Sequence, residues 1–138
     1  MKWTTYLATG AEPVIYHMCE TALYHKLTEN NGLYFSPTFE QDNFIHATEN
    51  PAMLLEAGTH FYKNSIGDWI CLKLNPELLT GPVIYEAPAP VGNIGAKEYE
   101  NSPKFPHIYG GIPAAAVIRQ YRIVRGSDGS FLSIENLC

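Results

Sequence analysis

The sequence predicts an α+β fold, in which two helices pack against a small, mainly antiparallel β-sheet. Strand-like and helix-like patterns alternate in the first half of the chain, and the second half reads mostly as strands. With 138 residues, of which 46% are apolar and 17% charged, the chain has the composition of a globular domain and the length to build one core. We therefore expect a single domain over residues 1–138.

Residues 14–18 are expected to form the first strand, and residues 20–29 the first helix. Apolar residues recur at every fourth position on one side of this helix, which is the spacing of a buried helical face. They are Cys19, Leu23 and Leu27. His25 falls on the opposite side and is predicted to face the solvent.

Residues 44–48 alternate in the manner of a strand, which places alternate side chains on one face. That face carries Phe44, His46 and Thr48. The Asn50–Pro51 pair then predicts the start of a second helix, because asparagine is a favoured N-cap and proline suits the first helical position. This helix is expected to run to Tyr62, with Gly58 as its weak point.

The second half of the chain contains the clearest strand, residues 69–74, whose nearly continuous apolar run indicates a central position in a sheet. Residues 83–86 form a short strand and lead into a loop over residues 87–106 that is rich in proline. A long loop inside a small domain is more typical of a functional segment than of a passive connection. The last two strands are predicted at residues 116–124 and 131–134, and residues 127–130 form the turn between them.

Charge and cysteine content restrict the partners and the compartment. A net charge of −5 argues against a nucleic-acid partner, because such surfaces are basic, but it leaves room for a small nucleotide site. Three cysteines without a CxxC pair give no disulfide framework and favour a reducing compartment. The N-terminus lacks a signal-peptide pattern, and no apolar run approaches the roughly 18 residues of a membrane span. We therefore expect a cytoplasmic protein with no membrane partner.

Three of the five histidines lie in strand-like segments that are far apart in the sequence: His17, His46 and His107. An imidazole among aromatic and aliphatic neighbours either bonds internally as a core residue or serves in a site. The recurrence of this pattern predicts one shared pocket. Polar residues in the same or neighbouring segments complete the candidate set: Thr48, Glu86 and Tyr109.

Two kinds of chemistry fit this set. Three imidazoles and a carboxylate can bind Zn²⁺ or Fe²⁺, but no two histidines have the spacing that puts two ligands on one element, so no metal is expected. In a nucleotide or sugar pocket, imidazoles and the Thr48 hydroxyl would bond to ribose, and tyrosine rings would stack on a base. Glu86 is then the candidate to stabilise an oxocarbenium-like transition state, as carboxylates do in glycosidases.

Four motifs occur in the order found in a known family, and through them the chain resembles family 952 of the domains of unknown function over about residues 14–134. The most specific motif is Phe-Pro-His-Ile-Tyr-Gly at residues 105–110. The others are Val-Ile-Tyr-His (14–17), Phe-Ile-His-Ala-Thr (44–48) and Asp-Gly-Ser-Phe (128–131). Where this family usually reads Gly-Phe-Ile-His-Cys-Ser, the chain has Asn43 in place of glycine, and Ala47 and Thr48 in place of cysteine and serine.

The resemblance implies a remote relationship to the ADP-ribosyltransferase fold, a split sheet that grips NAD. It further implies that the partner is a small-molecule nucleotide, with NAD or an ADP-ribose-containing compound as substrate and the N-glycosidic bond as the reacting bond. Under this hypothesis His17 and Thr48 position the ribose, and Tyr109 packs against a ring of the nucleotide. The catalytic candidates that supply polar stabilisation are His46, His107 and Glu86.

Two other interpretations stay open. A non-enzymatic binding module that senses a small nucleotide would use the same pocket without breaking a bond. A metal-dependent enzyme would instead use the three histidines as ligands. An NAD-cleaving enzyme would release nicotinamide, whereas a binding module would not. A metal-dependent enzyme would be identified by the metal content of the purified protein.

Overall fold

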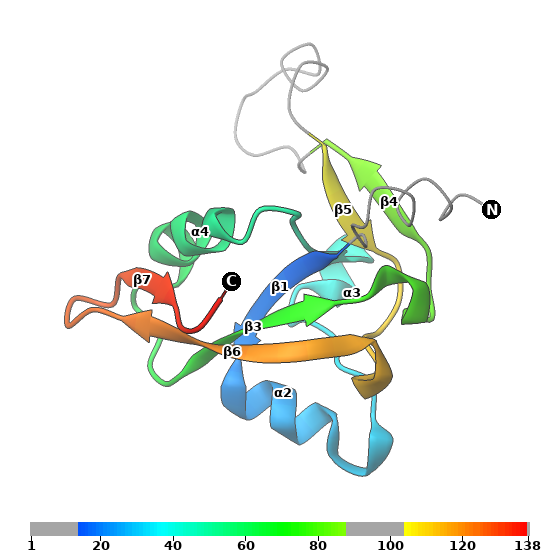
Figure 1. The fold of residues 1–138 in the computed structure, drawn as a ribbon, viewed down its shortest axis with the longest axis horizontal. Coiled ribbons are helices and arrows are strands. Elements are labelled where there is room, and N and C mark those ends of the chain that lie inside the picture. Colours follow the sequence, from blue (N-terminus) through cyan, green and yellow to red (C-terminus); the bar gives the residue numbers. More distant parts are fainter. Residues whose placement is uncertain (1–13, 88–103, 138) are drawn as a thin grey trace.

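The computed structural model describes residues 14–87 and 104–137, and in this part of the chain the predicted α+β fold is confirmed. Two antiparallel sheets form its framework (Figure 1). The first has the order β1-β3-β6-β7 and comprises β1 (Ile15–Glu20), β3 (Trp69–Leu74), β6 (Val117–Arg125) and β7 (Phe131–Ile134). The second has the order β2-β5-β4 and comprises β2 (Ile45–His46), β5 (Phe105–Ile108) and β4 (Val83–Glu86).

Short helices connect and cover these strands. The described α-helices are α2 (Thr21–Leu27), α3 (Phe39–Asp42) and α4 (Ala52–Tyr62), and the 3₁₀ turns are Glu29–Asn31, Pro76–Leu78 and Ala114–Ala116. Helices α2 and α4 correspond to the two predicted helices, whereas the four-residue α3 was not predicted because a single turn leaves no periodic apolar pattern. None of the described helices is long and apolar enough to cross a membrane.

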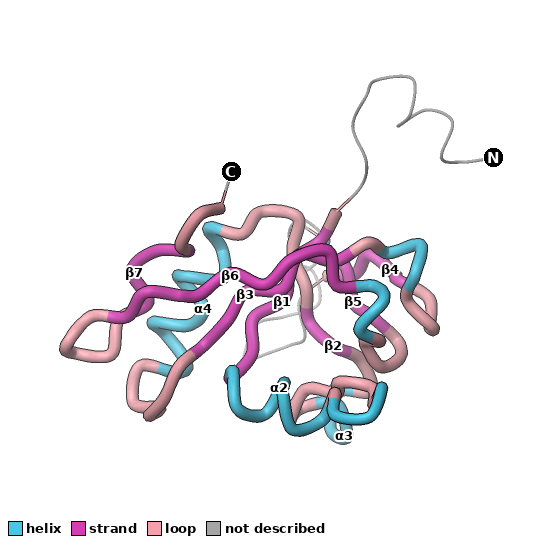
Figure 2. The backbone as a smooth tube through the Cα atoms, turned by 60° about the horizontal axis from the view of Figure 1, so that its bottom comes forward, coloured by secondary structure: helices cyan, strands magenta, loops and turns pink. Residues whose placement is uncertain are grey.

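Strand β3 of the four-stranded sheet is buried on both faces. In β3, Ile70 and Leu72 pack into one cluster with residues of α2 and of the three-stranded sheet, while Trp69 and Cys71 pack into another with residues of α4. Helices α2 and α4 therefore lie on opposite sides of the central strands (Figure 2). Burial on both faces is the reason why residues 69–74 form a continuous apolar run rather than an alternating one.

The three-stranded sheet has one buried face and one polar face. Ile45 and Ile108 lie opposite each other in the β2–β5 register and are fully buried in the core. The next pair in the same register is His46 and His107, whose side chains must point to the other face because alternate strand residues do. The predicted alternation of residues 44–48 placed Phe44 and His46 on one face, and their rings meet there at 4.7 Å.

The two sheets are joined where β1 meets the chain after β2. The backbones of Tyr16 and Thr48 exchange two hydrogen bonds, with N···O distances of 2.7 and 2.9 Å. Strand β2 covers only two residues, against the predicted 44–48, because the Thr48 hydroxyl accepts a hydrogen bond from the Asn50 N–H at 3.1 Å and turns the chain into α4. Asn50 caps that helix as predicted, since its Oδ1 accepts from the Ala52 N–H at 3.1 Å.

Other boundaries differ for local reasons. The first helix ends at Leu27, not residue 29, because Asn30 and Asn31 adopt positive φ angles of 54° and 64° that break the helical path. Of the loop predicted over residues 87–106, residues 88–103 lie outside the described residues, and β5 already begins at Phe105, which pairs with Glu86.

Candidate functional site

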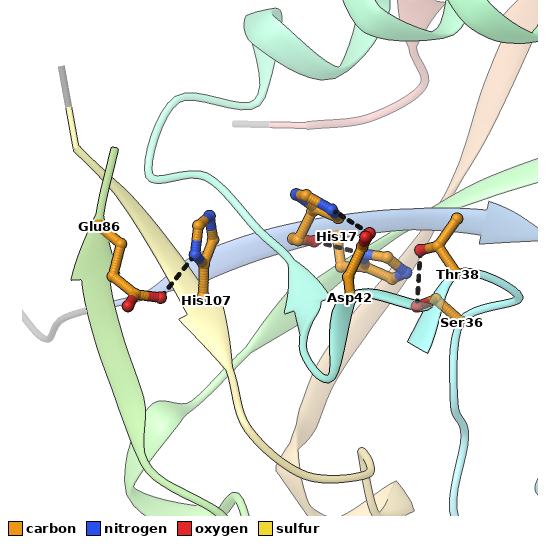
Figure 3. A network of polar contacts seen from close by, with 7 residues as sticks. His17, Ser36, Thr38, Asp42, Glu86 and His107 are labelled. Atoms are coloured by element: carbon orange, nitrogen blue, oxygen red, sulfur yellow. Dashed lines mark hydrogen bonds and ion pairs between the residues drawn. The ribbon is translucent and has the colours of Figure 1, made fainter. Parts of the chain in front are cut away.

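The Glu86 carboxylate on β4 accepts two hydrogen bonds, one from His107 on β5 and one from Tyr109, the residue that follows β5. His107 Nδ1 donates to Glu86 Oε1 at 2.8 Å, and the Tyr109 hydroxyl donates to the same oxygen at 2.5 Å. Figure 3 shows the side chains of Glu86 and His107 pointing toward each other from their neighbouring strands. Both donors use Oε1, so the second oxygen of Glu86 has no hydrogen-bond partner among the described residues, and the side chain is 39% exposed.

The hydrogen bonds fix the protonation states of this group. Donation from Tyr109 and then from His107 lowers the pKa of Glu86, so its carboxylate stays ionised. The same carboxylate raises the pKa of Tyr109, so the phenol stays protonated and keeps donating. The result is a half-exposed anion in a fixed orientation.

The local sequence explains why Tyr109 reaches this position. The Tyr109 N–H donates to the Pro82 carbonyl at 2.9 Å, which extends the β4–β5 pairing by one step. Next to this hydrogen bond the two backbone segments lie very close together. A Cβ on Gly81 would lie 2.0 Å from the Tyr109 carbonyl oxygen, and a Cβ on Gly110 would lie 3.1 Å from the Gly81 backbone. The glycine that ends the 105–110 motif therefore permits the approach that places Tyr109 beside Glu86.

Phe44 forms an aromatic wall over the same face. Its ring stacks on His107 with a centroid distance of 3.9 Å and an interplanar angle of 11°, and it meets Tyr109 at 5.4 Å. Stacking and the bond to Glu86 leave the His107 side chain only 3% exposed. His107 is therefore placed to orient Glu86, and the accessible surface is provided by Glu86 and its aromatic neighbours.

A second carboxylate–imidazole pair lies next to the first. His46 Nε2 donates to Asp42 Oδ2 at 2.9 Å, and the His46 ring meets the Phe44 and His107 rings edge-on, at 4.7 and 5.4 Å. Asn43, in the left-handed region at φ 66°, ends α3 and turns the chain into β2, so that Asp42 faces back toward His46. Unlike His107, the side chain of His46 is half exposed.

His17 is placed beneath this face and not on it. Its Nδ1 donates to the His46 carbonyl at 2.6 Å, and its Nε2 accepts from the Tyr34 hydroxyl at 3.2 Å. Burial lowers the pKa of His17 to about 4, so the ring is neutral and both of its nitrogens are satisfied inside the protein. His17 thus links the four-stranded sheet to the backbone of β2 at His46.

Among the described residues, no group of three histidine, cysteine, aspartate or glutamate side chains is arranged to hold a metal ion. His17 in particular is not available as a ligand, because both of its nitrogens are engaged by internal partners.

The sequence predicts one shared pocket, and the structure brings four of the six candidates together on one face of the sheet. Glu86, His107, Tyr109 and His46 lie together, while His17 lies beneath them and the Thr48 hydroxyl bonds within the turn before α4. Phe44 and Asp42 were not predicted as site residues. Phe44 was detectable from its place on the same strand face as His46, but Asp42 belongs to a helix too short to predict.

A hollow of about 490 Å³ lies elsewhere, beside the turn between β6 and β7. Arg125 lines it and has a structural role, because its guanidinium donates to the backbone carbonyls of Tyr62, Lys63, Ser65, Gly67 and Gly129. Asp128 accepts from the Ser130 N–H at 3.0 Å and closes the turn. The Asp-Gly-Ser-Phe motif therefore has a structural role, and this hollow is not the candidate site.

The fold is similar to that of protein CC0527 from Caulobacter crescentus. The crystal structure of CC0527 has a TM-score of 0.65 at 19% sequence identity, covering 85% of this chain and 91% of that chain. A crystal structure of its double mutant gives 0.65 at 18% identity, with the same coverage of 85% and 91%. Its solution NMR structure gives 0.63 at 18% identity, covering 86% and 91%. At such identities the likeness establishes the fold alone.

No curated protein matches the chain. The ADP-ribosyltransferase relationship implied by the motifs is not shown by these matches and stays a prediction. The family described as protein of unknown function (DUF952) matches residues 18–120, which include β2 to β5 and every residue of the polar face, while His17 lies just before the matched range. The match covers well over half of the sequence, and the protein belongs to the DUF952 family.

Proposed function

We propose that this protein binds NAD, or another nucleotide containing ADP-ribose, on the polar face of the three-stranded sheet and acts at the N-glycosidic bond. The observation that supports this most is the Glu86 carboxylate, which is ionised, 39% exposed, and held by His107 and Tyr109 through one oxygen, while the other has no partner among the described residues. Two of the motifs through which the chain resembles the DUF952 family, at residues 44–48 and 105–110, lie on this sheet, and the resemblance implies a remote relationship to a fold that grips NAD.

The chemistry of NAD matches such a group. Cleavage between the ribose and nicotinamide passes through a transition state in which positive charge builds up on the ribose, and an oriented carboxylate stabilises that charge. Because Glu86 is already ionised and oriented, little reorganisation is needed as the charge develops. Phe44 and Tyr109 supply aromatic rings beside it, on which a nicotinamide or adenine ring can stack.

The roles within the face follow from exposure. Glu86 is the residue that contacts the substrate, while the buried His107 and the hydroxyl of Tyr109 hold its carboxylate in place. His17 and Thr48, whose polar side-chain atoms bond within the protein, support the site through the backbone of β2 and the start of α4. A binding module without catalysis would use the same face, and release of nicotinamide distinguishes the two.

The first test is the thermal midpoint with and without millimolar NAD or ADP-ribose. A ligand present at about 100 times its dissociation constant adds about 2.7 kcal/mol of stability, which raises the midpoint of a domain of this size by several degrees. Phe44→Ala, which removes the aromatic wall, is expected to reduce this rise. His25→Ala, an exposed histidine on α2, is expected to retain it.

The comparison uses the rise in midpoint and not the midpoint itself, so any loss of basal stability in Phe44→Ala does not affect it. A wild-type chain whose midpoint moves with neither nucleotide contradicts the proposed function. A rise that is equal in the wild type and Phe44→Ala places the nucleotide elsewhere on the protein.

A further inference from the structure

We infer that the Asp42–His46 pair is the general base that activates the attacking water, or another hydroxyl acceptor, in the reaction at Glu86. This inference rests on the proposed function and adds to it the group that receives the proton. His46 and His107 are each bonded to a carboxylate, but the side chain of His46 is half exposed whereas that of His107 is buried.

The hydrogen bond to Asp42 determines which nitrogen of His46 is available. A carboxylate accepts, so His46 Nε2 carries the hydrogen and Nδ1 carries the free electron pair of the neutral ring. The described residues offer Nδ1 no hydrogen-bond partner, and the His46 side chain is 50% exposed. An imidazole held in one tautomer by a carboxylate, with its other nitrogen open to the solvent, has the arrangement of a general base.

His107 lacks this accessibility. Its Nδ1 donates to Glu86, its ring is covered by Phe44, and its side chain is 3% exposed. A water molecule can therefore approach His46 but not His107. In this scheme His107 orients the Glu86 carboxylate, and His46 receives the proton.

The strand order places His46 and Glu86 on the two outer strands of the sheet. His46 on β2 and Ile84 on β4 both pair with His107 on β5, and Glu86 lies two residues beyond Ile84 on the same face. With β5 between them, β2 and β4 are separated by two strand spacings, about 10 Å. The rings of His107 and Phe44 lie between the two groups, so a substrate that lies over these rings would have Glu86 on one side and His46 on the other.

The step balances without a further reactant. The bond between ribose C1′ and the nicotinamide ring nitrogen breaks, and its electron pair stays on that nitrogen, which leaves neutral nicotinamide. A bond forms between the water oxygen and C1′, and the proton of the water passes to His46 Nδ1. Asp42 stabilises the resulting imidazolium, which later releases the proton to the solvent, while Glu86 faces the positive charge that develops on the ribose.

Azide distinguishes a general base from other roles, because this anion attacks C1′ without giving up a proton. We expect His46→Ala to lower nicotinamide release in water by about 100-fold, the lower end of the range for loss of an acid–base group. Added azide should restore nicotinamide release and yield ADP-ribosyl azide. Glu86→Gln should be equally impaired but not restored by azide, since its defect lies in charge stabilisation. His25→Ala serves as the matched histidine control.

Asp42→Asn tests the positioning role without removing the imidazole. It should slow hydrolysis while leaving the azide reaction at the wild-type rate, whereas a merely structural loss would slow both. Because Asp42 and His46 lie at the surface of the site, both variants are expected to keep the wild-type rise in thermal midpoint with NAD.

The outcomes separate the two proposals. A wild-type chain that releases no nicotinamide overturns the proposed function and, with it, this inference. Wild-type release that stays within a few-fold in His46→Ala overturns the base assignment alone. Loss of release in His46→Ala that azide does not restore also overturns it, because His46 would then act in binding or in charge stabilisation.

Discussion

The three histidines of the strand segments lie in three different environments. His17 is enclosed and neutral, His107 is buried and bonded to Glu86, and His46 is half exposed and bonded to Asp42. The sequence surroundings of the three look alike, since each lies in a short apolar strand. What separates them is burial and the partner that each nitrogen meets, and both depend on residues remote in the sequence.

The neutral state of His17 predicts how stability depends on pH. Its pKa is about 4 in the folded protein and 6.5 in an unfolded chain, so between these values the unfolded chain binds a proton that the folded protein excludes. The free energy of unfolding should therefore fall as the pH drops from 6.5 to 4, by about 3 kcal/mol for a shift of this size, and His17 adds no loss below that window.

Urea unfolding of the wild type and His17→Gln at pH 7, 5.5 and 4 measures this effect. Glutamine keeps an amide donor for the His46 carbonyl but does not titrate, so its stability should vary less with pH than that of the wild type. Equal pH dependence in both chains would show that His17 is not the group responsible.

At the scale of elements, the prediction succeeded where the signal is local. Strands β3, β4 and β7 have the predicted bounds because turn residues delimit short apolar runs at each. It was less successful where a side chain takes a backbone partner. Strand β2 is shorter than predicted because Thr48 bonds into the turn. Helix α4 continues past Gly58, where it packs against Phe131 of β7.

Helix α4 offers a test of that packing. A Cβ on Gly58 would lie 2.3–2.7 Å from ring atoms of Phe131 on β7, so no larger residue fits without moving the ring. In a solvent-exposed helix, Gly→Ala stabilises by about 1 kcal/mol. Here overpacking should outweigh that gain, and Gly58→Ala should lower the free energy of unfolding by about 1–3 kcal/mol.

Chemical denaturation of a double-mutant cycle measures the interaction. In a Phe131→Leu background, the smaller and more flexible side chain can move aside, so the cost of Gly58→Ala should shrink. If Gly58→Ala stabilises the wild-type protein, the helix and β7 do not pack as closely as the structure indicates.

At the scale of the whole molecule, the candidate site depends on strand register. Segments near residues 42–46, 84–86 and 105–109 meet on one face only because His46 and Ile84 both pair with His107. A shift of one residue in either pairing would turn these side chains toward the core. Composition and local pattern do not specify such a register, so the sequence predicted Glu86, His107, Tyr109 and His46 but neither Phe44 and Asp42 nor the separate roles of the residues.

The two sheets and their helices form the support for this face. The Tyr16–Thr48 backbone pair and the bond from His17 to the His46 carbonyl tie β2 to the central sheet. The opposite side of the three-stranded sheet, at Ile45 and Ile108, is fixed in the main core. Glu86 and His46 are thus presented by strands that are buried on one face, which suits the fixed geometry that electrostatic catalysis requires.

The most direct test of the central claim is to measure, by chromatography, the rate at which the wild type and Glu86→Gln release nicotinamide from NAD. Loss of one preorganised stabilising group typically costs about 10²–10³ in rate. We expect release by the wild-type chain and a loss of that size in Glu86→Gln, with the thermal midpoints of the two chains remaining close. Release at the same rate by both chains, or by neither, would contradict the assignment of this face as the site where the N-glycosidic bond is broken.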